Sequence, residues 1–179
     1  MKVIYLVRHC EAVGQAPEDS LTVQGQEDTV RLIDFFRDKD IEMIISSPFV
    51  RTIETITPFA NTIEKEILID ERLKERVLST TDLENWMGKL EATYRDMDLK
   101  FEGGESSNEA MRRGIEVIEE QLERPESNII VVTHGALLSL IISHYSKEFG
   151  FEEWKNLKNP DIYKLEIDTQ GVRVEHLWR

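Results

Sequence analysis

The sequence is poor in cysteine, in basic residues and in long hydrophobic runs. Its one cysteine, Cys10, has no partner for an internal disulfide, and this fits a reducing compartment. The apolar run at residues 3–7 is too short to span a bilayer or to form the core of a signal peptide, and it ends in charged residues. We therefore expect a cytoplasmic protein.

Basic residues are scarce: 22 Lys and Arg stand against 35 Asp and Glu, which gives a net charge of -13. Nucleic acid and anionic lipid both need a basic surface, so this balance argues against either as a partner. A site for an anionic ligand would have to be a local cluster of cations. Screening at physiological salt makes such a cluster tolerable, because exposed charges beyond about 8 Å act weakly on one another. No spacing of His, Asp or Cys resembles a metal-ligand set, and we expect neither a metal nor another cofactor.

Short apolar runs alternate with amphipathic segments along the 179 residues, a length that suits one domain with a substantial core. The pattern predicts an α/β fold, a three-layer sandwich with a central, mostly parallel sheet flanked by helices, formed by one domain over residues 1–179. The predicted strands are 3–7, 43–45, 67–69 and 129–132, with an edge hairpin at 162–167 and 172–177. The predicted helices are 23–36, 49–61, one whose apolar stripe runs over 111–122, and 136–145.

Residues 77–104 are mostly polar, but apolar side chains recur there at helical spacing. We expect a helical excursion over the active site, in which the stripe that includes Trp86 and Leu90 serves core packing rather than ligand stacking. A capping box, Ser106 to Glu109, follows this segment and predicts the start of the next helix.

Five residues with catalytic side chains stand at or just after predicted strand ends: Arg8, His9, Arg51, Glu75 and His134. The carboxyl ends of parallel strands meet at one edge of a sheet, so we expect these side chains to converge on one pocket. Phosphoryl transfer needs a nucleophile, positive charge near the phosphoryl oxygens and a proton for the leaving group. This set of residues supplies each of them.

Four segments in order resemble motifs of the histidine phosphatase superfamily, the phosphoglycerate mutase-like proteins: LVRHCEA, SSPFVRTIET, RLKER and VVTHGALL. The resemblance implies that His9 is the nucleophile that takes up the phosphoryl group. It further implies that Glu75 is the acid and base and that His134 clamps the phosphoryl group.

The same resemblance implies a set of phosphate-binding residues. Arg8 and Arg51 match the family's phosphate ligands, and Gly135 opens a helix whose first backbone N–H groups favour an anion. Thr22, in SLTVQG, is similar to a segment of the phosphate pocket, and Gln15 stands where the family usually has an asparagine.

The chain departs from the family in two further places. Cys10 replaces the usual glycine after the histidine, and the glycine-tryptophan-glutamate cluster that often follows the acid residue is missing. A cysteine phosphatase would need an arginine six positions after Cys10, but Ala16 stands there, so we interpret Cys10 as a small, partly buried side chain. We interpret His144 and His176 as structural or surface residues.

Three functions agree with these observations. The first is a phosphatase that hydrolyses a small phosphomonoester, with a small phosphorylated metabolite as its partner. The second is a cofactor-dependent phosphoglycerate mutase, and the third is a non-catalytic module that binds phosphorylated ligands. Mutases of the family typically carry long insertions that enclose the site, and this chain is short, so we favour hydrolysis.

Overall fold

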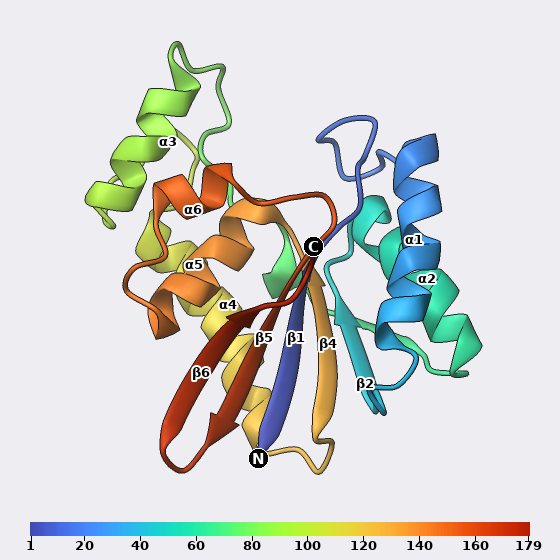
Figure 1. Cartoon of the computed structure of the whole chain (residues 1–179). Coiled ribbons are helices and arrows are strands. Elements are labelled where there is room, and N and C mark those ends of the chain that lie inside the picture. Colours follow the sequence, from blue (N-terminus) through green and yellow to red (C-terminus); the bar gives the residue numbers. More distant parts are fainter.

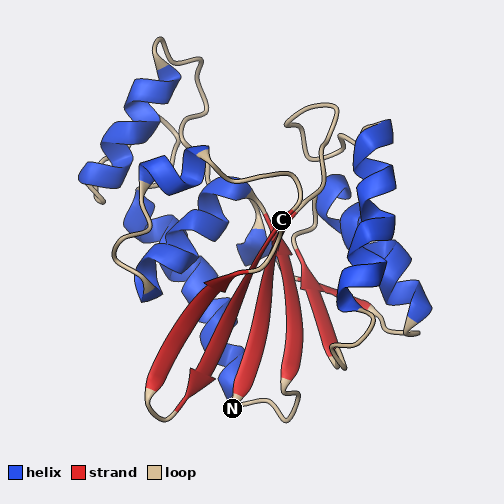
Figure 2. Ribbon diagram, in the orientation of Figure 1, coloured by secondary structure: helices blue, strands red, loops and turns tan.

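One mixed sheet of six strands, in the order β3-β2-β4-β1-β5-β6, organises the computed structural model, which describes residues 1–179 (Figures 1 and 2). The strands β1 to β4 run parallel to one another, whereas β5 is antiparallel to β1 and β6 is antiparallel to β5. The strands are β1 (Lys2–Arg8), β2 (Met43–Ser46), β3 (Ile67–Ile69), β4 (Asn128–Thr133), β5 (Asp161–Asp168) and β6 (Gly171–His176).

The two central strands, β1 and β4, are buried on both faces, which explains their uninterrupted apolar sequences. The mostly parallel sheet is confirmed, as is the hairpin of β5 and β6, whose outer strand forms one edge. None of the helices combines the length and the apolar content that a membrane span requires.

Helices cover both faces of the sheet and complete the predicted three-layer sandwich (Figure 2). On one face, Leu32 of α1 and Phe59 of α2 join the core, and on the other face Ile118 of α4 and Leu137 of α5 do so. The helices are α1 (Val23–Phe36), α2 (Val50–Thr62), α3 (Trp86–Arg95), α4 (Ser107–Leu122), α5 (Gly135–Tyr145) and α6 (Phe151–Lys155), with a short 3-10 turn, η1 (Glu71–Leu73).

The segment 77–104 contains one helix, α3, and is otherwise irregular. In Figure 1, α3 lies beyond the end of the sheet toward which β1 and β4 run, on the side of α4 and α5. Leu90 is buried as expected, but Trp86 is 53% exposed, so the prediction that this whole stripe packs in the core is wrong. Met87, the next residue of α3, is 40% exposed as well, so the first turn of this short helix is not covered by the rest of the protein.

The register of the sheet places three polar residues beside one another. Arg8 pairs with Thr133, and Ser46 pairs with Val132, so β1, β2 and β4 end at the same level. The next residues along the chain are His9, Ser47 and His134. Their backbones are tied to β4: the His9 N–H donates to the Thr133 carbonyl at 3.2 Å, and the Ser47 N–H donates to the Val132 carbonyl at 3.0 Å.

Candidate active site

His9 carries its proton on the ring nitrogen that faces the backbone. Its Nδ1 lies 2.7 Å from the Cys10 carbonyl oxygen, which can only accept, so Nδ1 donates and the lone pair remains on Nε2. The Nε–H of Arg51 donates to this Nε2 at 3.2 Å. The pKa of His9 is lowered to about 3, mainly by burial; the Cys10 hydrogen bond opposes this shift, and the charges of Arg51 and Arg8 add to it. The imidazole is therefore neutral at physiological pH and has a nucleophilic nitrogen.

A second imidazole, His134, stands beside the first. The two ring centroids are 5.3 Å apart, and His134 is completely buried at the start of α5. Burial lowers the pKa of His134 well below its usual value, and the neighbouring His9 and Arg51 act in the same direction. Its Nε2 lies 2.8 Å from Oγ of Ser47. Our sequence analysis did not select Ser47, although it follows β2 in the way that His9 follows β1.

Arg51 brings positive charge to His9 from the first turn of α2. Its side chain is almost fully buried, and Nη1 donates to the Ala16 carbonyl at 2.9 Å and to the Gln15 carbonyl at 3.3 Å. The loop that follows β1 is thus folded onto this guanidinium. Burial lowers the pKa of Arg51, and the Glu75 carboxylate opposes that shift.

Arg8 supplies the second guanidinium. Its Nη1 donates to the Leu157 carbonyl at 3.1 Å, and its plane lies against Gly135, where a Cβ would come within 2.9 Å of Arg8 Nε. Only glycine allows this approach. Burial lowers the pKa of Arg8, and Glu75 is the largest of the opposing influences.

Glu75 places its carboxylate at the first turn of α5, next to His134. Oε2 accepts from the Ala136 N–H at 3.0 Å, and Oε1 accepts from the Leu137 N–H at 3.0 Å. The N-terminus of a helix stabilises a negative charge, so α5 and Glu75 support one another. The negative charge of this carboxylate also opposes the lowering of the pKa values of both Arg8 and Arg51.

The structure therefore brings together six of the predicted residues: Arg8, His9, Arg51, Glu75, His134 and Gly135. The other two predicted residues have different surroundings. Gln15 contacts Arg51 through its backbone carbonyl, and its side chain is exposed. Thr22 is the N-cap of α1: its Oγ1 accepts from the Gly25 N–H at 3.0 Å and donates to Glu11 Oε1 at 2.8 Å.

Two residues around His9 complete the site. Asn159, which our sequence analysis missed, donates from Nδ2 to the His9 carbonyl at 2.9 Å. It lies 150 positions away in the sequence, where no local pattern could connect it with His9. The thiol of Cys10 is completely buried, more deeply than the partly buried side chain that we predicted, and burial raises its pKa to about 12.

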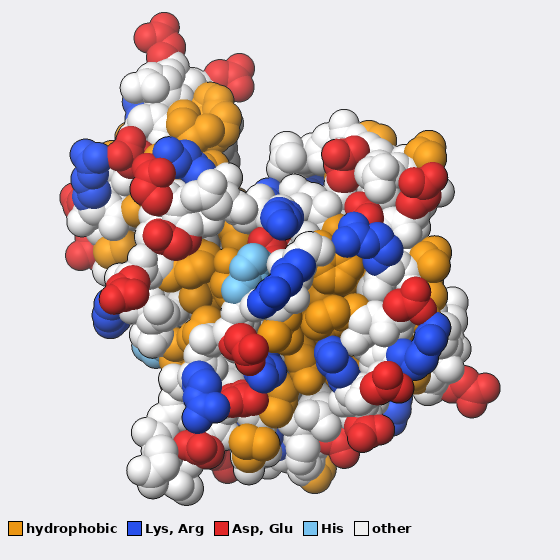
Figure 3. All heavy atoms as spheres, viewed as in Figure 1, with side chains coloured by type: hydrophobic (Ala, Val, Ile, Leu, Met, Phe, Trp, Pro, Cys, Tyr) orange, Lys and Arg blue, Asp and Glu red, His pale blue; other side chains and the backbone are white.

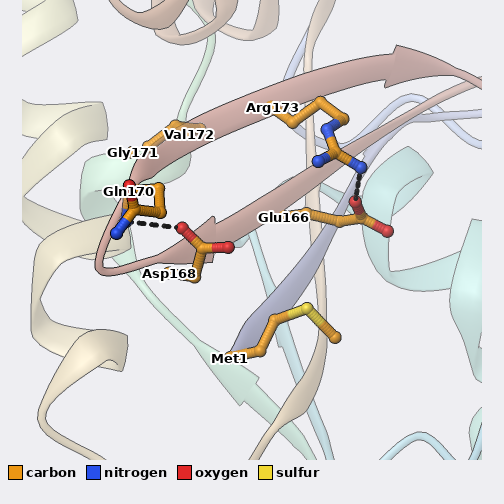
Figure 4. Close-up of a pocket in the computed structure, with 7 residues that line it drawn as sticks. All are labelled: Met1, Glu166, Asp168, Gln170, Gly171, Val172 and Arg173. Carbon is orange, nitrogen blue, oxygen red and sulfur yellow. Dashed lines mark hydrogen bonds and ion pairs between the residues drawn. The ribbon is translucent and has the colours of Figure 1, made fainter.

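The surface of the molecule has one hollow beside the site and another away from it. In Figure 3 the outline is notched between the α3 side and the α1 side, at the end of the sheet where the site lies. Figure 4 shows the other hollow, at the turn between β5 and β6, where Arg173 is paired with Glu166 at 3.1 Å and Asp168 accepts from the Gln170 N–H. That hollow has no cluster of cations for an anion.

Paired imidazoles flanked by arginines, at the carboxyl edge of an α/β sheet, are suited to handling phosphoryl groups. Comparison with known families identifies the class of protein to which the chain belongs. Residues 4–178 match the family model of the Histidine phosphatase superfamily (branch 1), and the chain belongs to this family.

Relatives of the chain include phosphatases and mutases. A protein of Hydrogenobacter thermophilus, provisionally named phosphoserine phosphatase 2, is 27% identical over 99% of this chain and 90% of its own length. "Probable phosphoglycerate mutase GpmB" of Escherichia fergusonii is 30% identical over 80% of this chain and 74% of its own. A mycobacterial glucosyl-3-phosphoglycerate phosphatase, solved with inorganic phosphate, is 18% identical and has a TM-score of 0.79 over 99% of this chain and 96% of that one. The solved structure shares the fold, and the family match together with the two sequence relatives supports enzymatic phosphoryl transfer or hydrolysis.

Proposed function

We propose that this protein is a phosphatase that hydrolyses a small phosphomonoester through a phosphohistidine intermediate on His9. One observation carries the proposal: Nδ1 of a neutral, buried His9 is held by the Cys10 carbonyl while Nε2 faces the Arg51 guanidinium. A nucleophile must offer a lone pair beside positive charge that stabilises the phosphoryl oxygens in the transition state.

In the first step, Nε2 of His9 attacks phosphorus, and the bond from phosphorus to the ester oxygen breaks. Glu75, in its protonated form, donates the proton that the departing alcohol needs. In the second step, water attacks the phosphohistidine, the nitrogen-phosphorus bond breaks, and the Glu75 carboxylate takes up the proton of the water. Acid and base roles on one carboxyl group agree with microscopic reversibility.

The phosphoryl oxygens are held by the guanidinium groups of Arg8 and Arg51, by His134 and by the backbone at Gly135. Gln15 and Thr22 complete the pocket in this proposal; Thr22 would act there in addition to capping α1. No metal or other cofactor takes part. We further propose that the segment 77–104 lies over the active site of this single domain and sets the substrate class, a small phosphorylated metabolite of the cytoplasm.

Phosphoglycerate mutase activity is the second candidate, favoured by the name of the Escherichia fergusonii relative. A mutase must keep the phosphohistidine intact long enough to return the phosphoryl group to a second hydroxyl. The same His9 would serve both reactions, so a test of the nucleophile covers either function.

Hydrolysis of p-nitrophenyl phosphate at mildly acidic and neutral pH, with a chelator present, tests the proposal. We expect wild type to turn over, and His9→Ala to lose activity by at least about 10³-fold, because removal of a nucleophile abolishes the covalent route. His144→Ala is the matched control, since His144 is an exposed histidine of α5. Hydrolysis by His9→Ala at the wild-type rate would refute the mechanism. Interconversion of phosphoglycerates without hydrolysis would identify a mutase.

A further inference from the structure

The side chain of Arg113, in α4, donates hydrogen bonds to the backbone that leads to Glu75. Its Nη1 donates to the Arg72 carbonyl at 2.5 Å and to the Lys74 carbonyl at 2.8 Å, and its Nη2 donates to the Glu75 carbonyl at 3.3 Å. The planar guanidinium thus satisfies three carbonyl groups of one short stretch. A lysine could not reproduce this fork of donors.

Glu105 adds hydrogen bonds to the backbone on the other side of Glu75. Its carboxylate receives two hydrogen bonds from Arg113, at 2.7 Å and 3.0 Å. Oε2 also accepts from the Val77 N–H at 2.9 Å, and the Glu105 N–H donates to the Val77 carbonyl at 2.7 Å. The pair therefore holds the chain on both sides of Glu75.

The segment between these contacts has no regular structure of its own. Residues 75–79 lie in neither a helix nor a strand, so no regular pattern of backbone hydrogen bonds places them, and the contacts with Arg113 and Glu105 contribute to their position. The side chains of Arg113 and Glu105 are only 20% and 25% exposed, which limits screening by solvent. An exposed ion pair of the same kind would contribute little.

We propose that Arg113 and Glu105 are positioning residues that hold the Glu75 carboxyl group beside His134 in reach of the leaving group. This inference rests on the proposed function, because it assigns the pair a purpose in proton donation by Glu75. Neither residue touches the substrate in this arrangement; both act through the backbone of residues 72–77.

The test compares esters that differ in their need for a proton. p-Nitrophenolate departs without protonation, whereas the alkoxide of glycerol phosphate must receive a proton as it leaves. We expect Arg113→Gln and Glu105→Gln to lower kcat/KM for glycerol phosphate by about tenfold or more, as expected for loss of a hydrogen-bonded charged group. For p-nitrophenyl phosphate we expect a change of less than about threefold, with KM little altered.

A double-mutant cycle with Glu75→Gln measures how strongly the effects of Arg113 and Glu75 on kcat/KM depend on one another. If the pair acts through Glu75, Arg113→Gln should change kcat/KM by less than about twofold once Glu75 is already replaced. Ile118→Val is the control for a general loss of stability, because Ile118 is buried on the same helix and its apolar side chain takes no part in the hydrogen bonds of Arg113 and Glu105. It should lower the melting temperature and leave the ratio of the two substrates unchanged. Glu105→Gln keeps an acceptor for Val77 and serves if Arg113→Gln fails to fold.

Two results would overturn the inference. Equal losses on both esters would show that the pair only stabilises the fold, as would a full additional loss in the Glu75→Gln background. If wild type hydrolyses neither ester, the proposed function fails and the positioning role fails with it. If wild type is active and the cycle is additive, only the positioning role is wrong.

Discussion

His9 is kept neutral by burial and by the two guanidinium groups, with no carboxylate bound to its ring. Its Nδ1 contacts a carbonyl oxygen, so the proton on that nitrogen is stabilised without the ring becoming charged. The pKa of about 3 leaves Nε2 unprotonated across the whole physiological range, with the Arg51 N–H as its hydrogen-bond donor. A nucleophile prepared in this way needs no general base to deprotonate it.

The low pKa of His9 predicts a loss of stability in acid. In the unfolded chain a histidine binds its proton near about pH 6.5, whereas folded His9 does so only at about 3. Between these values the unfolded state holds the extra proton, so the free energy of unfolding falls as the pH drops, by up to about 1.4 kcal/mol per unit. His9→Gln should lose less stability than wild type between about pH 7 and pH 4 in urea unfolding. The exposed control His144→Gln should follow the wild-type curve, and parallel curves for all three proteins would contradict the prediction.

The helices differ in which groups accept hydrogen bonds from the free backbone N–H groups of their first turns. Ser106 and Glu109 form the predicted capping box of α4, and Thr22 caps α1. The N-cap residue of α5, His134, makes no side-chain cap bond, and the acceptors for that helix come from Glu75. The start of α5 thereby joins the proposed acid to the second imidazole, and Gly135 packs against Arg8 at the same point.

The tight contact at the start of α5 makes Gly135 sensitive to a single methyl group. A Cβ there would lie 2.9 Å from Arg8 Nε and 3.0 Å from Arg8 Cζ, so the guanidinium must move. We expect Gly135→Ala to weaken competitive inhibition by inorganic phosphate by about tenfold, the value of one charge-assisted hydrogen bond. Gly150→Ala is the control, because its Cβ would meet only the Glu153 carboxylate, at 3.7 Å. Unchanged inhibition in Gly135→Ala would mean that Arg8 does not bind phosphate.

At the scale of the whole molecule, a net charge of -13 surrounds a small cationic site. The guanidinium groups of Arg8 and Arg51 are largely buried at the carboxyl edge of the sheet. Solvent screens the many exposed carboxylates more effectively than these buried cations. The long-range field repels an anionic substrate, and the local field attracts it.

This balance predicts an unusual response to salt. Raising the ionic strength from about 0.01 M to about 0.15 M shortens the Debye length from about 30 Å to about 8 Å, which removes the distant repulsion before the local attraction. We expect kcat/KM for p-nitrophenyl phosphate to rise over this range, by less than about tenfold. Initial rates in potassium chloride would measure it, with sulfate and phosphate left out because they compete for the site. A steady fall in kcat/KM would show that the local cations dominate association.

Much of the architecture could be read from local patterns. The apolar runs that became β1, β2, β3 and β4 are too short and too continuous for amphipathic helices, and the edge hairpin alternates in the way that a half-buried strand requires. The two short elements α6 and η1 were not predicted, because five and three residues are too few to show a period. Trp86 fits a helical stripe, but the stripe alone does not tell which of its members the rest of the fold covers.

By itself the sequence determined the parallel strands, the helix starts and the order of the motifs that carry Arg8, His9, Arg51, Glu75 and His134. Only the tertiary structure decided which side chains from distant parts of the sequence contact these residues. Ser47 reaches His134 across 87 positions, and Asn159 reaches the His9 carbonyl across 150. Local periodicity reports which face of an element is buried. A contact between distant segments depends on strand order, register and side-chain reach, and these are set when the whole chain packs.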